Sequence, residues 1–208
     1  LTGATVSGPP GSPPAISVDM PTNPNAGDKV KFTFKLPDGT SEVVELTAST
    51  NNPLGPGEFA IGATSDVTAA NLQSALTTAT GKLANTSLVA ASALAASDNF
   101  FNASPPLRVS GPPFDSATSL VAGTSANTVM WYTGESGTDP ARGTAVARVD
   151  QSITVQYGAR ATEEGLRWQL QTIAAYAAVT TSSTDPNAKE QVQALNNRVA
   201  ANLAPQQG

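Results

Sequence analysis

Residues 30–46, VKFTFKLPDGTSEVVEL, decide the fold class of this 208-residue chain. Apolar and polar residues alternate up to Leu36, the turn triplet Pro37-Asp38-Gly39 follows, and apolar residues return at Val44 and Leu46. An alternation of period two on either side of turn residues predicts a β-hairpin with one buried face. The charges on the other face are expected to form exposed cross-strand pairs, which are common and weak, and not a catalytic site: Lys31, Lys35, Glu42 and Glu45.

The chain that follows the hairpin predicts a helix packed on the sheet. A Gly/Pro-rich turn and a short strand over residues 58–61 come first, and residues 64–66 are candidate N-caps. Leucines and alanines then recur at three- and four-residue spacing, with Gly81 as the expected terminator. Residues 87–96 are small and apolar without a clear period. Strand and helix both remain open there, with a lean toward strand from Leu88-Val89.

Two proline-rich stretches carry no regular pattern. Residues 1–27 hold six prolines among glycines and serines, which predicts a surface arm or loop. Between residues 97 and 127, proline pairs punctuate short segments, so long regular elements are not expected. Beyond Thr128 the period of two returns, and strands are predicted at three places separated by turn residues: 129–132, 145–149 and 153–157.

The last fifty residues predict two helices. Thr162 is the expected cap of the first helix, and Asp185 is the expected N-cap of the second, with Pro186 at its first position. A short polar loop joins the two helices, so they should pack antiparallel, with their apolar stripes facing each other. These helix-packing stripes consist of Leu166, Leu170 and Ile173 in the first helix and Val192, Leu195 and Val199 in the second.

The expected fold class is therefore α+β, a β-rich module with one packed helix that is joined to strands and a terminal antiparallel helical hairpin. Three parts are expected along the chain. Residues 1–27 are the arm or loop, residues 28–127 are the β-rich outer module, and residues 128–208 are the strands followed by the helical hairpin.

Composition excludes several kinds of active site. The chain has no cysteine and no histidine, which removes thiol nucleophiles, histidine-dependent triads and zinc sites. The carboxylates are scattered, no loop has calcium-binding spacing, and no glycine pattern matches a phosphate-binding loop. We therefore expect no enzyme activity, no catalytic residue, no cofactor and no metal.

The charge pattern bears on possible partners. Only 13% of residues are charged and the net charge is −5, without a cluster of Lys or Arg. Nucleic acids and anionic membranes are therefore not expected as partners. No apolar stretch approaches the ~20 residues that cross a bilayer. Because the chain starts without Met, it is expected to be processed or to be the middle piece of a longer protein.

Three aromatic residues offer an alternative binding function. Trp131, Tyr132 and Trp168 are platforms on which a carbohydrate ring can stack. In a chain with 5% aromatic residues, however, such side chains are more often needed for the core. We therefore favour core packing for them and keep an extracellular carbohydrate- or surface-binding module as an alternative function.

A family resemblance rests on residues 130–180. The segments that carry it are WYTGE (131–135), ARVDQS (147–152), VQYGARA (155–161) and the helix over 163–178. They resemble the region of alphaproteobacterial flagellins and related hook-filament junction proteins in which the outer domain returns to the helical shaft. Residues 32–101 look like the β-rich module inserted in the centre of such proteins. The chain departs from the family pattern because it lacks the long heptad-like helices expected at both ends.

The resemblance implies a function outside the cell, in the bacterial flagellum. A flagellin is a structural subunit that acts in motility by self-assembly, and its partners are other flagellin-family subunits and hook-associated proteins. The junction protein between hook and filament is the alternative within the same organelle. On this view the 208-residue piece is expected to be monomeric, while the full-length subunit polymerises through helices that continue the terminal hairpin.

Overall fold

A computed structural model describes residues 5–7, 16–114, 117–135 and 137–203 of the chain. Residue contacts divide it into two compact units, which we treat separately. Unit 1 consists of Leu1–Ala91 and Ser182–Ala194, and unit 2 consists of Ser92–Thr181 and Leu195–Gly208. This division differs from the boundaries at residues 27 and 127 that the sequence predicts.

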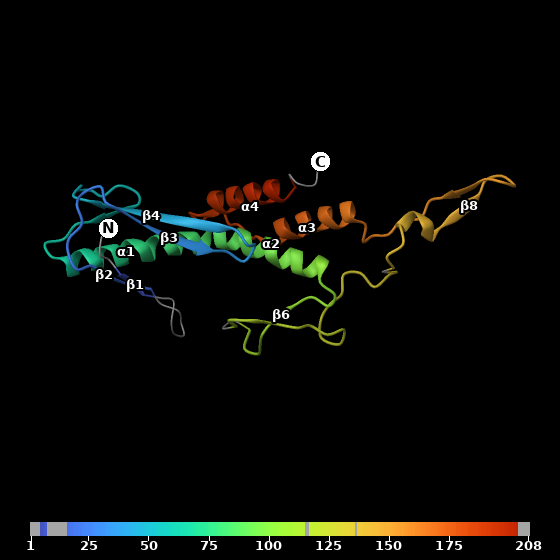
Figure 1. The fold of residues 1–208 in the computed structure, drawn as a ribbon, viewed down its shortest axis with the longest axis horizontal. Coiled ribbons are helices and arrows are strands. Elements are labelled where there is room, and N and C mark those ends of the chain that lie inside the picture. Colours follow the sequence, from blue (N-terminus) through green and yellow to red (C-terminus); the bar gives the residue numbers. More distant parts are fainter. Residues whose placement is uncertain (1–4, 8–15, 115–116, 136, 204–208) are drawn as a thin grey trace. The chain divides into compact units, whose positions relative to one another are not determined.

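Unit 1 is built on a three-stranded sheet with one helix against it (Figure 1). Strands β3 (Lys29–Lys35) and β4 (Ser41–Ser49) pair antiparallel, which confirms the predicted hairpin. Strand β5 (Glu58–Ala60) adds in parallel to β4, and helix α1 (Ser65–Asn85) packs on β4 and β5. The core that they share consists of Met20, Phe32, Leu46, Ala48, Phe59, Leu72 and Leu76.

The charged face of the hairpin agrees with expectation only in part. Glu45 lies opposite Lys31 in the register and forms ion pairs with Lys29 at 2.5 Å and Lys31 at 3.0 Å. The predicted role of Lys35 and Glu42 as cross-strand partners is wrong. Lys35 lies opposite Ser41, and the carboxylate of Glu42 instead accepts a 3.0 Å hydrogen bond from the hydroxyl of Ser87.

The N-terminal region is not only an arm. Strand β2 (Ser17–Asp19) pairs antiparallel with β1 (Thr5–Ser7), and Met20, with 3% exposure, belongs to the core. The prediction of a loop is wrong for residues 17–20, because it rested on the prolines and took no account of the apolar residues between them. Two hydrogen bonds of Asn23 connect this segment to α1 and to the turn before it. The Thr68 hydroxyl donates to Asn23 Oδ1 at 2.7 Å, and Asn23 Nδ2 donates to the Gly62 carbonyl at 3.0 Å.

Helix α1 begins as predicted and ends later. Thr64 is the N-cap, and its hydroxyl accepts a hydrogen bond from the Val67 N–H at 3.3 Å. Gly81 does not terminate the helix, which continues to Asn85. A single glycine on the surface of a helix costs about 1 kcal/mol relative to alanine, and the turns on either side of it supply enough hydrogen bonds and contacts to offset that.

Residues 87–102 form a second helix, α2 (Ser87–Asn102), directly after α1. The lean toward a strand over residues 87–96 is therefore wrong, and so is the expectation of only short elements as far as Asn102. Alanine is the best helix former, and Ala90, Ala91 and Ala93 are all buried, so this face of α2 allows close packing. The boundary between the two units falls within α2, after Ala91.

The remaining strands of unit 2 are short. Strands β6 (Arg108–Val109) and β7 (Leu120–Val121) form one antiparallel pair, and β8 (Val146–Arg148) and β9 (Thr154–Gln156) form another, preceded by the 3-10 helix η1 (Ala141–Thr144). The β8–β9 pair confirms the two later predicted strands. Residues 129–132 form no strand, because Trp131 is held by side-chain contacts and not by a ladder.

Helices α3 (Glu164–Ala178) and α4 (Ala188–Leu203) form the C-terminal helical hairpin, so the chain is an α+β protein, as predicted. Their caps differ in detail from expectation. Glu163 and not Thr162 is the N-cap of α3. Helix α4 begins at Ala188, and the Asp185 carboxylate accepts the Asn187 N–H at 2.8 Å just ahead of it.

Candidate interaction surfaces

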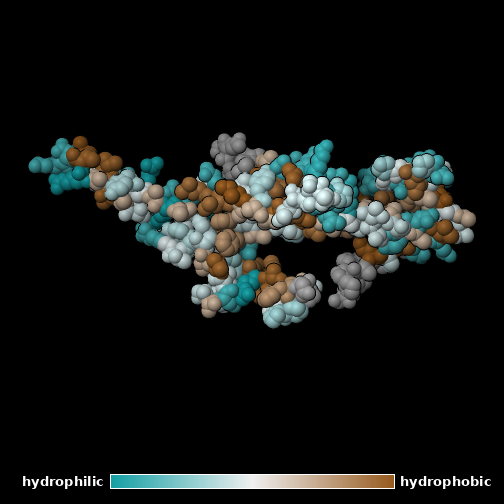
Figure 2. Space-filling model, turned by 180° about the vertical axis from the view of Figure 1, so that it is seen from behind, coloured by the Kyte–Doolittle hydropathy of each residue, from teal (hydrophilic) through white to brown (hydrophobic). Residues whose placement is uncertain are grey.

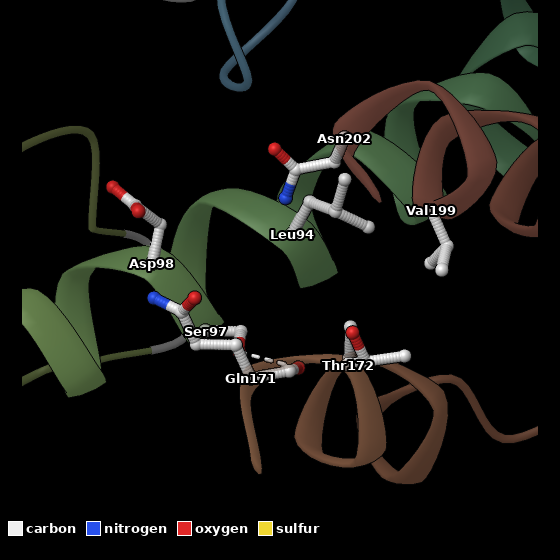
Figure 3. Close-up of a pocket in the computed structure, with 8 residues that line it drawn as sticks. Leu94, Ser97, Asp98, Gln171, Thr172, Val199 and Asn202 are labelled. Carbon is white, nitrogen blue, oxygen red and sulfur yellow. Dashed lines mark hydrogen bonds between the residues drawn. The ribbon is translucent and has the colours of Figure 1, made fainter. Parts of the chain in front are cut away.

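Three helices of unit 2 meet around a small polar junction (Figure 3). The Ser97 hydroxyl on α2 donates a 2.7 Å hydrogen bond to the backbone carbonyl of Gln171 on α3. The cavity between them measures about 20 Å³, which is room for one water molecule and no organic ligand. It is lined by Leu94, Ser97, Asp98, Gln171, Thr172, Ala175, Val199 and Asn202.

The predicted stripe on α4 is buried at two of its three positions. Leu195 is 2% exposed and Val199 is 7% exposed, whereas Val192 is 41% exposed. Near these residues the hydroxyl of Tyr176 on α3 donates to Oδ1 of Asn196 at 2.6 Å. Leu195 and Val199 are therefore packing residues of the folded chain.

The predicted stripe on α3 lies on the outside of its helix. Leu166 is 47% exposed, Leu170 is 39% exposed and Ile173 is 64% exposed, whereas Gln171 and Ala175 are buried. The prediction that this stripe faces the one on α4 is therefore wrong. The small side chain of Ala175 allows close packing, and the hydrogen bond from Ser97 to the Gln171 carbonyl favours this face of α3 for the interior, so the leucines remain uncovered.

A second uncovered apolar surface is one face of the β8–β9 hairpin. In the observed register Ala147 pairs with Val155. On either side of this pair, the Val149 N–H donates a hydrogen bond to the Ile153 carbonyl at 2.9 Å, and the Tyr157 N–H donates one to the Ala145 carbonyl at 3.0 Å. Because side chains alternate across a strand, all six lie on the same face. Four of them are 46 to 63% exposed, namely Val149, Ile153, Val155 and Tyr157. We call these six residues the hairpin apolar face, and hydrophobic side chains are visible on this hairpin in Figure 2.

The base of this hairpin is held by specific contacts. The guanidinium of Arg160 donates to the carbonyls of Gly137 at 2.8 Å and Asp139 at 2.9 Å, and it lies 3.5 Å from the Glu135 carboxylate. Gly158 is buried at the same place. A Cβ there would lie 2.2 Å from the Thr144 hydroxyl and 2.3 Å from the Ala141 carbonyl, so only glycine fits. The hairpin is thus anchored at its base while its apolar face stays open.

Unit 1 carries a groove of about 570 Å³ between β5 and α1. Its walls include the side chains of Leu46, Leu54, Phe59, Ala75 and Ala79. The polar groups at its rim are already engaged: Asn71 donates to the Ala60 carbonyl at 3.0 Å, and Lys82 forms a 2.9 Å ion pair with Glu190. We call this the α1–β5 groove, and its lining suits apolar side chains.

Two carboxylates of unit 1 have a lowered pKa. For Glu45 the cause is mainly the hydrogen bonds from Lys29 and Lys31. For Glu58 the pKa is lowered by the backbone N–H of Gly55, at 2.7 Å, and then by Asn51. A catalytic acid needs the opposite shift, so neither residue is suited to donate a proton near neutral pH.

The aromatic residues proposed for carbohydrate stacking are engaged within the chain. Trp131 Nε1 donates to the Phe101 carbonyl at 3.0 Å, and the Trp131 ring contacts those of Phe101 at 5.0 Å and Tyr132 at 5.6 Å. Trp168 is half-buried on the inner face of α3. This arrangement favours packing over a free stacking platform.

The described residues contain no group of three or more acidic residues placed to hold a metal ion, and none of their helices is both long and apolar enough to cross a membrane. Comparison with known proteins found no matching family model, no matching curated protein and no matching solved structure. The uncovered apolar surfaces are the candidate interaction sites of the described residues.

Proposed function

We propose that this chain is the outer part of a structural subunit of the bacterial flagellar filament, which works outside the cell by assembling with other subunits and carries out no chemistry. The observation that carries the proposal is the uncovered stripe on α3, Leu166, Leu170 and Ile173. Burying a fully exposed leucine or isoleucine gains about 1.5–3 kcal/mol, and these three side chains, which are 39 to 64% exposed, would gain roughly half of that each. An assembly that covers this stripe would be stabilised accordingly.

The sequence resemblance to flagellins supports the same proposal independently. The α3 stripe lies within the resembling segment, where the outer domain would return to the shaft. In that setting, neighbouring subunits or continuing helices of the intact subunit would cover it. Exposed apolar clusters of this kind are typical of protein–protein contact sites in soluble proteins.

The test is assembly of the intact subunit with Ile173→Glu. This variant should abolish filament formation in seeded polymerisation, because a charge would be buried without a partner. The melting temperature should stay unchanged, because Ile173 is exposed in the folded chain. Gln169→Glu is the matched control, since Gln169 is also exposed on α3 and flanks the stripe with a side chain that is already polar.

Filament formation by the Ile173→Glu subunit at the wild-type rate would refute this role of α3. A subunit that stays monomeric under every seeded condition, without any substitution, would refute the proposed function itself. The hook-filament junction protein would use the same exposed stripe. Counting the subunits in a purified filament separates the two, because a junction protein forms a short zone and a flagellin forms the length of the filament.

A further inference from the structure

We propose that copies of this chain associate head to tail, with the hairpin apolar face of one copy lying in the α1–β5 groove of the next. This rests on the proposed function, because it names a partner surface within an assembly of like subunits. It concerns surfaces other than the α3 stripe. The two proposals can therefore fail separately.

The hairpin is the surface that needs a partner. A two-stranded hairpin is marginally stable alone in water, and its stability normally requires a hydrophobic face packed on another element. Here Val149, Ile153, Val155 and Tyr157 form such a face and remain exposed. The opposite face carries one apolar residue, Val146, with Arg148, Thr154 and Gln156. The Arg148 guanidinium on that face donates to the Asp150 and Gln151 carbonyls. The face with Val149, Ile153, Val155 and Tyr157 is thus the one suited to a broad apolar contact.

The groove is the surface that can accept it. Leu46 and Phe59 are buried in the core next to it, and on α1 the small side chains of Ala75 and Ala79 leave space above the helix. A volume of about 570 Å³ is large enough for several aliphatic or aromatic side chains. The rim groups of Asn71 and Lys82 already have partners, so an apolar occupant would leave these polar atoms satisfied.

Charge favours a second copy of the same chain as the occupant. Unit 1 holds all five lysines of the protein against nine Asp and Glu residues, so it is acidic. Residues 141–160, which include the hairpin, hold three arginines and one aspartate and are basic. The segment that carries the exposed apolar face therefore has the charge that unit 1 attracts, which favours encounter between the two surfaces.

The consequence of such a contact is a ring or an open polymer of chains, in contrast to the monomer that the flagellin resemblance implies for this piece. The hairpin and the groove are different surfaces, so each copy has one of each to offer. A contact between two different patches generates either a closed ring or an open helical polymer, in contrast to a symmetric dimer. Such a contact would supply a connection between like subunits, which a filament requires.

Because the chain contains no cysteine, single cysteines report this contact without background. Val155→Cys places a thiol on the hairpin apolar face, and Ser74→Cys places one on the exposed rim of the groove. The controls are Thr154→Cys, on the opposite face of β9, and Thr77→Cys, on α1 outside the groove. Each hairpin variant is mixed with each helix variant and a short bis-maleimide, and products are identified by mass. Mixing single-cysteine chains ensures that every crosslink joins two copies.

The Val155→Cys and Ser74→Cys pair should crosslink about tenfold faster than the three control pairs, because binding raises the effective concentration of the two thiols. The advantage should shrink as ionic strength rises. Equal rates in all four pairs, or fastest crosslinking of Val155→Cys with itself, would overturn the proposal. Ile153→Cys with Thr78→Cys is the second pair in case one variant does not fold.

The crosslinking result is independent of filament assembly. If the pairs show no preference and the intact subunit still polymerises, the hairpin–groove contact is refuted and the proposed function stands. If the preferred pair crosslinks but the intact subunit never polymerises, the contact stands and the filament function is refuted.

Discussion

Gln191 on α4 donates a 2.6 Å hydrogen bond from Nε2 to the backbone carbonyl of Asn85, at the point where α1 ends and α2 begins. The interruption at Thr86 leaves helix carbonyls without their usual intrahelical donors. Gln191 supplies one of the missing donors, and it is buried at 7% exposure. The Lys82–Glu190 ion pair lies beside it. Helix α4 thus contacts the junction between the consecutive helices α1 and α2 from a residue 106 positions further along the chain.

Gln191→Met should destabilise the protein by about 0.5–1.5 kcal/mol, because it removes the hydrogen bond to the Asn85 carbonyl while keeping the side-chain volume similar. Urea unfolding followed by circular dichroism measures the change. Gln193→Met, at an exposed position of the same helix, should change stability by less than about 0.5 kcal/mol. Equal effects of the two substitutions would show that the hydrogen bond at the junction does not matter.

Leu195→Ala should cost about 2–5 kcal/mol, because Leu195 is 2% exposed and its removal leaves a cavity. Val192→Ala, on the same helix but 41% exposed, should cost much less. The free energy of unfolding of both variants tests this difference. A Leu195→Ala variant as stable as Val192→Ala would mean that α4 does not pack as described.

Acid should weaken unit 1 through Glu45. Its pKa is lowered in the folded state by Lys29 and Lys31, so its contribution to stability is present above the ordinary pKa of 4.5 and is lost as pH falls through the lowered pKa. Glu45→Gln should therefore flatten the fall in stability below about pH 4.5. Unfolding midpoints across this range measure it. High salt, which screens exposed ion pairs, should flatten it in the same way, and an unchanged profile in both cases would contradict the ion-pair explanation.

Gly158→Ala should disrupt the base of the β8–β9 hairpin, because the added methyl group would meet the Thr144 hydroxyl and the Ala141 carbonyl. A loss of about 1–3 kcal/mol, the usual cost of overpacking, is expected. Gly143→Ala is the matched control, since nothing lies within 4 Å of the position of its Cβ. Proteolysis within residues 141–160 provides a local readout, and it should increase for Gly158→Ala alone.

The parts of the fold that were predicted correctly have strong local signals. The alternation around Pro37-Asp38-Gly39 and the Thr64 cap each specify structure through nearby residues, and both are found. The core role of Met20 was missed because it depends on contacts with a sheet and helix that are distant in the chain. Residues 87–96 were ambiguous because alanine and other small residues carry no clear period.

The candidate surfaces show the same limit. Apolar spacing correctly identified Leu195 and Val199 as buried, but it also selected Leu166, Leu170 and Ile173 for the interior, where the structure places Gln171 and Ala175. Helix α3 carries an apolar stripe and a second, mixed face with Trp168, Gln171 and Ala175, and either face could lie inward. The choice depends on the partner, here α2 with Ser97, and the sequence of α3 alone does not contain it.

All lysines of the chain lie in unit 1 and all arginines lie in unit 2, so each unit can be labelled selectively by a reagent for one of these side chains. Amine-reactive dyes and crosslinkers will modify side chains of unit 1 only, and arginine-selective dicarbonyl reagents will modify those of unit 2 only. Mass spectrometry after such labelling can therefore follow the two units separately through unfolding or assembly, and no residue has to be substituted to introduce a label.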